Sequence, residues 1–242
     1  MNGVTNHGAI VRDLGLIDYK EGWDYQTTLF NQILELKAAN RDHAVSEQKE
    51  TPNYILICEH PNVYTLGKSG KEQNLLMPLE QLTDINATYY PINRGGDITY
   101  HGPGQVVVYP VVDLDNFFTD IHKYMRLLEE AVIQTLAEFG LEGHRISGLT
   151  GVWLDVENDP RKICAFGVKT SRWVTMHGLA LNVNTDMSYF SHIVACGIEG
   201  KGVTSMEKEL GHAVDMKKVK SVIIDKLVAL FEMQLVEPVT IL

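Results

Sequence analysis

The sequence predicts an α+β protein of one domain, with a mixed or largely antiparallel sheet flanked by helices. Short β-rich segments cluster in the middle of the chain, and amphipathic helical patterns flank and interrupt them. Strand and helix patterns do not alternate regularly, which argues against a parallel α/β sheet. No internal repeat or low-complexity linker divides the 242 residues, so we expect a single domain over residues 1–242.

The first third of the chain begins with a helix and continues into a strand. Apolar residues recur at helical spacing over residues 19–40, which predicts an amphipathic helix. The polar stretch 40–51 is expected to be a loop. The short apolar run 54–59 predicts a buried strand that ends at His60-Pro61, and residues 65–77 are rich in turn-forming residues.

The middle of the chain is β-rich and ends in a helix. Residues 88–93, 97–101 and 105–112 are β-prone, and the glycines between them are typical of tight β connections. Residues 124–139 carry one apolar stripe at helical spacing, and we expect Gly140 to follow the helix as its C′ residue.

The last third predicts a meander and a final helix. Residues 151–156, 163–170 and 173–183 have the pattern of three consecutive strands, and a C-terminal helix is expected at about 215–232. The pair Gly95-Gly96 is not followed by a helical pattern, which argues against a dinucleotide-binding turn or a P-loop.

Composition excludes several classes of protein. The chain has 21 Lys and Arg against 31 Asp and Glu, a net charge of −10, so it lacks the basic field that nucleic-acid binding normally uses. No apolar run resembles a signal peptide or a membrane span, so we expect a cytoplasmic protein that does not bind membranes. Three cysteines without a Cys-x-x-Cys pair indicate free thiols rather than disulfides or a zinc site.

Cys196 and Lys162 are the candidate catalytic pair. Cys196 lies between the small residues Ala195 and Gly197, which favours an accessible thiol. A free thiol has a pKa near ~8.5, so a nearby ammonium is needed to stabilise much of it as thiolate at neutral pH. Lys162 can supply that charge and can also carry a proton, which predicts acyl transfer through a thioester. The alternative is that Cys196 is a buried small residue and Lys162 an ordinary surface charge.

The other two thiols have simpler interpretations. If the segment around Lys162 is a regular strand, Lys162 and Cys164 point to the same face, and Cys164 could lie beside the lysine. Its neighbours Ile163 and Phe166 nevertheless favour a core position. Cys58, inside an aliphatic run, is expected to pack in the core.

The glycine-rich run at residues 94–105 is the candidate acyl-binding segment. Glycines allow the backbone to pass close to a substrate and to direct N–H groups at its carbonyl oxygen. By itself the run could be a simple turn between strands. Among the histidines, we expect His101 to contact substrate, and His60 and His177 to be supporting hydrogen-bonded groups. No His-x-x-x-His or similar spacing predicts a metal site.

Six motifs together resemble the family of lipoyl(octanoyl) transferases, over about residues 10–200. They are DLGLIDY at 13–19, EHPNVYTLG at 59–67, RGGDITYHGPGQ at 94–105, KICAFG at 162–167, HGLALNV at 177–183 and ACGI at 195–198. The combination of the His-Gly-Pro-Gly-Gln sequence with Lys162 and Cys196 is more specific than any one motif.

The resemblance implies a fold, a reaction and a set of site residues. The fold is that of the biotin/lipoate protein ligase catalytic domain. The reaction is transfer of an octanoyl group from acyl carrier protein to a lysine of lipoyl domains, those of 2-oxoacid dehydrogenases and the glycine cleavage H protein, as the first step of endogenous lipoate synthesis. Cys196 and Lys162 would be catalytic, with no metal or cofactor. The implied substrate-binding residues are Arg94, Gly95, Gly96, Asp97, Ile98, Thr99, Tyr100, His101, Ala165, Phe166, Gly167, Gly178, Leu179 and Ala180.

Three other functions are compatible with the same residues. An ATP-dependent lipoate or biotin ligase on this fold would adenylate a free acid and would need no cysteine nucleophile. A non-catalytic acyl-binding module would leave Cys196 inert. Transfer between two lipoyl domains would use the same thioester chemistry with another donor.

Overall fold

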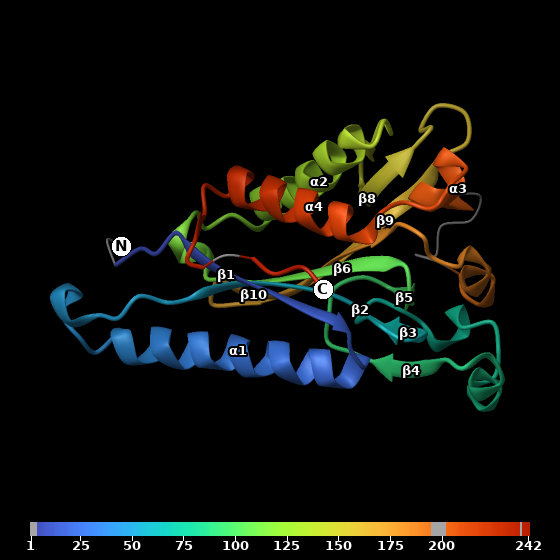
Figure 1. Ribbon diagram of the computed structural model, residues 1–242. Coiled ribbons are helices and arrows are strands. Elements are labelled where there is room, and N and C mark those ends of the chain that lie inside the picture. The colour runs from blue at the N-terminus through green and yellow to red at the C-terminus, as the bar shows by residue number, and fades with distance from the viewer. Residues whose placement is uncertain (1–3, 195–201, 238) are drawn as a thin grey trace.

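The computed structural model describes residues 4–194, 202–237 and 239–242, which form two sheets and four α-helices (Figure 1). The larger sheet contains β12 (Gln234–Leu235), β1 (Gly8–Leu16), β2 (Asn53–Glu59), β6 (Gln105–Val111), β10 (Val174–Asn182), β9 (Arg161–Ser171), β8 (Leu149–Leu154) and β7 (His144–Ile146) in that spatial order, and β11 (Gly202–Val203) pairs with β9. The smaller sheet has the order β4 (Thr88–Pro91), β3 (Val63–Leu66) and β5 (Ile98–His101). The helices are α1 (Tyr19–Asn40), α2 (Ile121–Glu138), α3 (Met206–Leu210) and α4 (Met216–Leu230).

Both sheets are mixed, as the sequence predicted. In the large sheet β1 runs parallel to β2 and β12, whereas β2, β6, β10, β9 and β8 pair antiparallel in succession. In the small sheet β3 is parallel to β4 and antiparallel to β5. The predicted meander of three strands is therefore confirmed as β8, β9 and β10.

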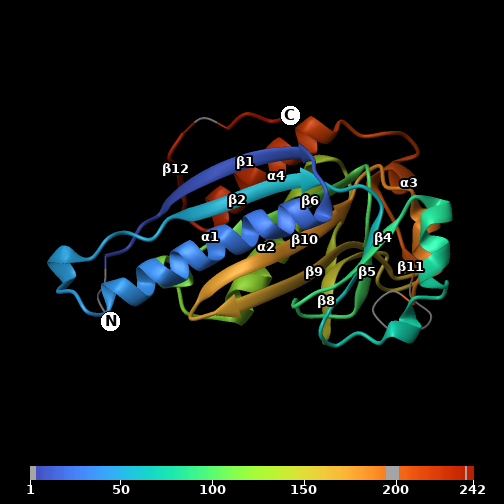
Figure 2. The ribbon, with the colours of Figure 1, turned by 90° about the horizontal axis from the view of Figure 1, so that it is seen from below.

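Helices cover the large sheet on both faces. Helices α2 and α4 lie on one face and α1 lies on the other (Figure 1 and Figure 2). The alternation along β6 explains this arrangement. Val106 and Val108 pack in the cluster under α2 and α4, whereas Val107, Tyr109 and Val111 pack with α1. A strand that is buried on both faces reads as one continuous apolar run, which is why the sequence predicted its position well.

The helix ends follow ordinary capping chemistry. The carboxylate of Asp18 accepts hydrogen bonds from backbone N–H groups in the first turn of α1, and Asp120 and Asp215 do the same for α2 and α4. Gly140 has a φ of +79° just after α2, as expected for a C′ glycine. The predicted helices are thus confirmed within a few residues.

The first strand was not predicted. Strand β1 carries Arg12, Asp13 and Gly15 in its middle, and its pairing with β2 is irregular between Asp13 and Leu16. These residues interrupt the apolar alternation by which a strand is recognised. Strand β3 was not predicted either, and it ends within the region 65–77 that was expected to be rich in turns.

A bulge in β9 overturns the expected orientation of Cys164. Val152 of β8 pairs with Cys164 and Trp153 pairs with Lys162, so Ile163 is an extra residue in β9. Ile163 and Cys164 both lie in the core cluster under α2 and α4, whereas Lys162 lines a cavity. The prediction that Lys162 and Cys164 share a face was wrong because it assumed regular alternation.

Candidate active site

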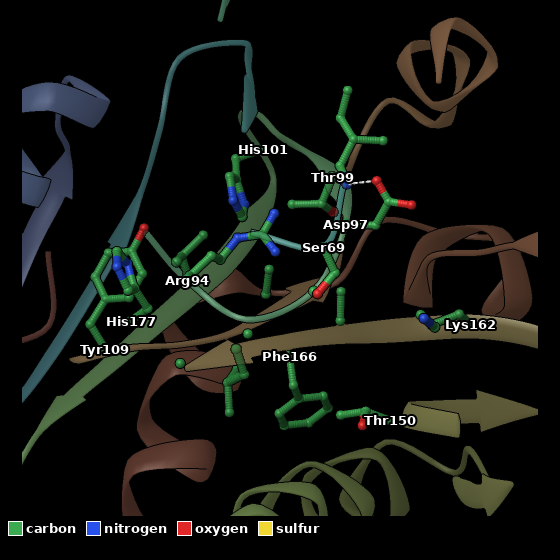
Figure 3. Close-up of a pocket in the computed structure, with 18 of the residues that line it drawn as sticks. Ser69, Arg94, Asp97, Thr99, His101, Tyr109, Thr150, Lys162, Phe166 and His177 are labelled. Carbon is green, nitrogen blue, oxygen red and sulfur yellow. Dashed lines mark hydrogen bonds between the residues drawn. The ribbon is translucent and has the colours of Figure 1, made fainter. Parts of the chain in front are cut away.

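A cavity of about 390 Å³ lies between the small sheet and strands β9 and β10 (Figure 3). Residues 94, 96–99 and 101 form one wall, and β9 and β10 form the opposite wall. The lining is completed by Tyr19 at the start of α1, Ser69, Val107, Tyr109 and residues 148–150. The volume is within the usual range for small-molecule sites. The cavity therefore joins segments that are distant in the sequence.

Most of the expected binding residues line this cavity. They are Arg94, Gly96, Asp97, Ile98, Thr99, His101, Ala165, Phe166, Gly167, Gly178, Leu179 and Ala180, and the expected catalytic Lys162 lines it too. Tyr100 does not, since it packs on the other side of β5, stacked on Tyr189 and donating to Asn62 Oδ1 at 2.8 Å. Gly95 is not in the lining either, and its N–H donates to Val168 O at 3.0 Å. That bond ties the glycine-rich segment to β9.

Arg94 holds the glycine-rich segment against β3. One guanidinium nitrogen donates to the Thr65 carbonyl and hydroxyl oxygens, both at 3.0 Å, and another donates to Gly95 O at 3.0 Å. A Cβ on Gly67 or on Gly167 would lie 3.0 or 3.1 Å from the Arg94 guanidinium. The two glycines thus leave the space that this buried side chain occupies.

Small residues form the wall made by β9 and β10. Ala165 pairs with Ala180, and Gly167 pairs with Gly178. Side chains this small leave room for a ligand above the sheet, and Phe166 adds an apolar surface. Gly178 is also required by the fold, since a Cβ there would lie 2.2 Å from Val108 O.

Lys162 stands at one end of the cavity, far from His177 at the other (Figure 3). Its side chain is 6% exposed, and its Nζ lies 4.7 Å from the centre of the Trp153 ring. The ring face attracts a cation at this distance. Gly151, with a φ of +142°, provides the space for the lysine stem, because a Cβ there would lie 3.0 Å from Lys162 Cε. The ammonium is thereby directed to the cavity.

The two cysteines within the described ranges do not line the cavity. Cys58 and Cys164 are both fully buried, and burial raises the pKa of each thiol well above its ordinary value. Both are inert packing residues, as expected. Cys196 lies outside the described residues.

The three motif histidines are buried and neutral. Burial lowers the pKa of His101 and of His177 to about 3, and it also lowers the pKa of His60. His101 Nδ1 donates to Gln105 Oε1 at 2.7 Å, and Gln105 in turn donates to Asn182 Oδ1. His60 donates through Nδ1 to Ile17 O and accepts at Nε2 from the Tyr109 hydroxyl, each at 2.8 Å. His101 and His177 line the cavity, whereas His60 lies behind Tyr109.

Several lining residues were not anticipated. Tyr19, Ser69, Tyr109, Leu149 and Thr150 line the cavity. Tyr19 was part of a recognised motif, but nothing local distinguishes a tyrosine that lines a site from one that starts a helix. Tyr109 sits in a strand that is buried on both faces, so its pattern does not reveal which face it uses.

The described residues contain no group of three or more His, Cys, Asp or Glu side chains that could hold a metal ion. No helix in the same ranges is long and apolar enough to cross a membrane.

A buried lysine stands at one end of a cavity that is walled by small residues, on a mixed sheet with helices on both faces. The model of the lipoyl protein ligase A/B catalytic domain matches residues 18–228, and the chain belongs to this family. It is 58% identical over 237 residues to an octanoyltransferase of Cytophaga hutchinsonii, covering 97% of each chain. It is 59% identical over 228 residues to an octanoyltransferase of Flavobacterium johnsoniae, covering 93% of this chain and 97% of that one.

A solved structure of lipoate-protein ligase A bound with ATP has the same fold. Its TM-score is 0.64 at 14% identity, with 98% of this chain and 90% of that chain covered. The expected ligase-type fold is thus confirmed.

Proposed function

We propose that this protein transfers an octanoyl group from acyl carrier protein to a lysine of a lipoyl domain, through a thioester on Cys196. The observation that carries the proposal is the cavity that joins Lys162 to the glycine-rich segment and to the small residues of β9 and β10. The octanoyltransferases to which the chain is more than half identical support the choice of acyl group.

In the first step the Cys196 thiolate attacks the carbonyl carbon of the octanoyl thioester. The bond from that carbon to the carrier's sulfur breaks, and the carrier leaves as a thiol after it takes a proton. Lys162 stabilises the thiolate by its charge and supplies this proton. The cation attraction of the Trp153 ring and the slot above Gly151 orient the ammonium for both tasks.

In the second step the lysine amine of the lipoyl domain attacks the acyl-enzyme. The amide bond forms, the bond to Cys196 Sγ breaks, and the amine proton passes to Lys162. Backbone N–H groups of the glycine-rich segment are suited to stabilise the negative charge that develops on the carbonyl oxygen in both steps. The apolar lining by Ile98, Phe166 and Leu179 holds the acyl chain away from water.

No metal or nucleotide is needed in this scheme, because the donor is already an activated thioester. We infer a cytoplasmic setting, where free thiols persist and carrier proteins are loaded. The acceptors would be lipoyl domains of 2-oxoacid dehydrogenases and the glycine cleavage H protein.

Intact-mass spectrometry after incubation with octanoyl-acyl carrier protein tests the proposal. We expect the protein to gain one octanoyl group, mapped to Cys196 by peptide analysis, and to lose it when a lipoyl domain is added. Cys196→Ala should abolish the adduct. Lys162→Met should reduce transfer at least ~100-fold, whereas Lys169→Met should not, since Lys169 lies on the same strand over the Phe30 ring and outside the cavity lining.

Two outcomes would contradict the scheme. Modification of the lipoyl domain only with free octanoate and ATP would indicate a ligase, and an adduct on Cys164 would overturn the choice of nucleophile. Competition between octanoyl-acyl carrier protein and an octanoylated lipoyl domain identifies the preferred donor.

A further inference from the structure

The cavity extends well beyond the length of an octanoyl group. His177 pairs with Val168, six residues along β9 from Lys162, which corresponds to roughly 18 Å at the rise of a strand with a bulge. The seven carbon–carbon bonds of an extended octanoyl chain span only about 9 Å. If the acyl carbonyl lies near Lys162, as the proposed function requires, the chain ends short of the far end. Figure 3 shows Arg94 between Lys162 and His177.

The far end of the cavity is formed by polar rings. The Tyr19 ring stacks on His101 at 5.9 Å, and the Tyr109 ring meets His177 edge to face at 6.5 Å. All four rings are at least nine-tenths buried, as is Arg94. An apolar chain end would therefore meet a cation and several hydrogen-bonding groups here.

Two groups at this end have no hydrogen bond within the described ranges. His177 Nε2 is inaccessible to solvent and has no partner there. The Tyr19 hydroxyl has no such bond either, but it is not among the solvent-inaccessible atoms, and Tyr19 lines the cavity. Polar atoms inside a protein are nearly always paired, and an unpaired one needs an explanation. A ligand group in the cavity can complete the Tyr19 hydroxyl, whereas His177 Nε2 is closed to a group of the size of water.

The charge of Arg94 acts on both residues. Burial raises the pKa of the Tyr19 phenol, and the Arg94 charge offsets part of that rise. Burial lowers the pKa of His177, and the Arg94 charge lowers it further. Tyr19 is thus a neutral donor and acceptor at neutral pH and can bond an uncharged group such as a hydroxyl, and the neutral His177 adds no charge to this end.

We propose that the Arg94, Tyr19 and His177 end of the cavity is a polar subsite that accepts acyl chains longer than octanoyl only when they carry a hydrogen-bonding group at the far terminus. It holds water when an octanoyl chain is bound. A longer apolar chain displaces that water and leaves the Tyr19 hydroxyl unpaired, whereas a terminal hydroxyl replaces the water. This inference rests on the proposed function for the acyl group's position, and it adds a rule for chain selection.

Binding of free fatty acids tests the subsite without requiring transfer. Isothermal titration of the intact protein would compare dodecanoate with 12-hydroxydodecanoate, whose 12 carbons span about 14 Å. Because the hydroxyl makes the acid less hydrophobic, a simple apolar pocket would prefer dodecanoate. We expect the hydroxy acid to bind roughly 10-fold more tightly, from one or two buried hydrogen bonds.

A matched pair of variants locates the effect. Tyr19→Phe should reduce the preference for the hydroxy acid at least ~3-fold. Tyr90→Phe removes a hydroxyl from the ring stacked on Tyr19, but Tyr90 does not line the cavity, so the preference should not change. Thermal unfolding of each variant verifies its fold, and the wild-type comparison decides the question without them.

Equal or tighter binding of dodecanoate by the wild-type protein would overturn the polar subsite, as would an unchanged preference in a folded Tyr19→Phe variant. The two proposals fail separately. A hydroxy-acid preference without octanoyl transfer would refute only the proposed function, and normal transfer with a preference for dodecanoate would refute only the subsite.

Discussion

Adding one methyl group at Gly167 should damage the site more than it damages the fold. In Gly167→Ala the new Cβ would lie 2.8 Å from Gly95 O and 2.9 Å from Arg94 Cδ. Comfortable contacts are near ~3.5 Å, so the glycine-rich segment must retreat by at least ~0.5 Å. Gly95 is fixed to β9 by its bond to Val168 O, so the strain cannot be relieved by a side chain alone. Overpacking of this kind costs about 1–3 kcal/mol of stability.

The effect on transfer should be larger. A shift of the glycine-rich segment by a fraction of an ångström to 1 Å moves the backbone donors away from the reacting carbonyl, which can cost up to ~100-fold in rate. The rate would be followed by the mass of an octanoylated lipoyl domain, and stability by urea unfolding.

Gly95→Ala is the matched control. Its Cβ would meet Val168 O at 3.3 Å and no other atom of the described residues within 4 Å, so the same methyl in the same segment should cost far less. A Gly167→Ala variant that transfers octanoyl at the wild-type rate, with an unchanged urea midpoint, would refute the close packing that underlies this reasoning.

Two further predictions concern titration. Burial raises the pKa of the Cys58 and Cys164 thiols, so iodoacetamide near neutral pH should alkylate Cys196 and leave these two thiols unmodified. Peptide mapping would identify the alkylated cysteines. Labelling of Cys58 or Cys164 in the folded protein would contradict their buried state. His101 and His177 have pKa values of about 3 when folded, against ~6.5 when unfolded, so the unfolded chain binds more protons between these pH values. Stability should therefore fall as the pH is lowered from ~6.5 toward 3, by up to ~1.4 kcal/mol per pH unit for each histidine, and the slope of the urea midpoint against pH should be shallower in His101→Gln.

The sequence predicted those elements whose burial pattern is uniform. Helix α2 shows a complete stripe and a C′ glycine, and every residue of β6 and β10 is buried. Strand β1 was not predicted because charged residues and a glycine interrupt its apolar alternation. The predicted orientation of the Cys164 side chain was wrong, because an extra residue in β9 cannot be recognised from local composition.

The site was predicted as a set of segments rather than as a shape. Most of the glycines and alanines at the positions of the resemblance line the cavity, but Gly95 does not, and Tyr100 packs on Tyr189 at the other side of β5. Tyr19 and Tyr109 line the cavity as a result of tertiary packing. No periodic pattern in the sequence predicts such packing. The catalytic role of Cys196 and Lys162 stays a prediction.

The extra residue in β9 allows Lys162 to face the cavity although Cys164, two positions along the chain, faces the core. Without the bulge, a strand of the same length would place both side chains on one face. The ammonium would then enter the apolar core under α2, where an unpaired charge costs several kcal/mol. Deletion of Ile163 would instead make Lys162 the direct neighbour of Cys164 on the opposite face, so a related chain with a gap of one residue here would keep its lysine at the cavity. Grafting this site onto another sheet would require transplanting the irregularity together with the lysine.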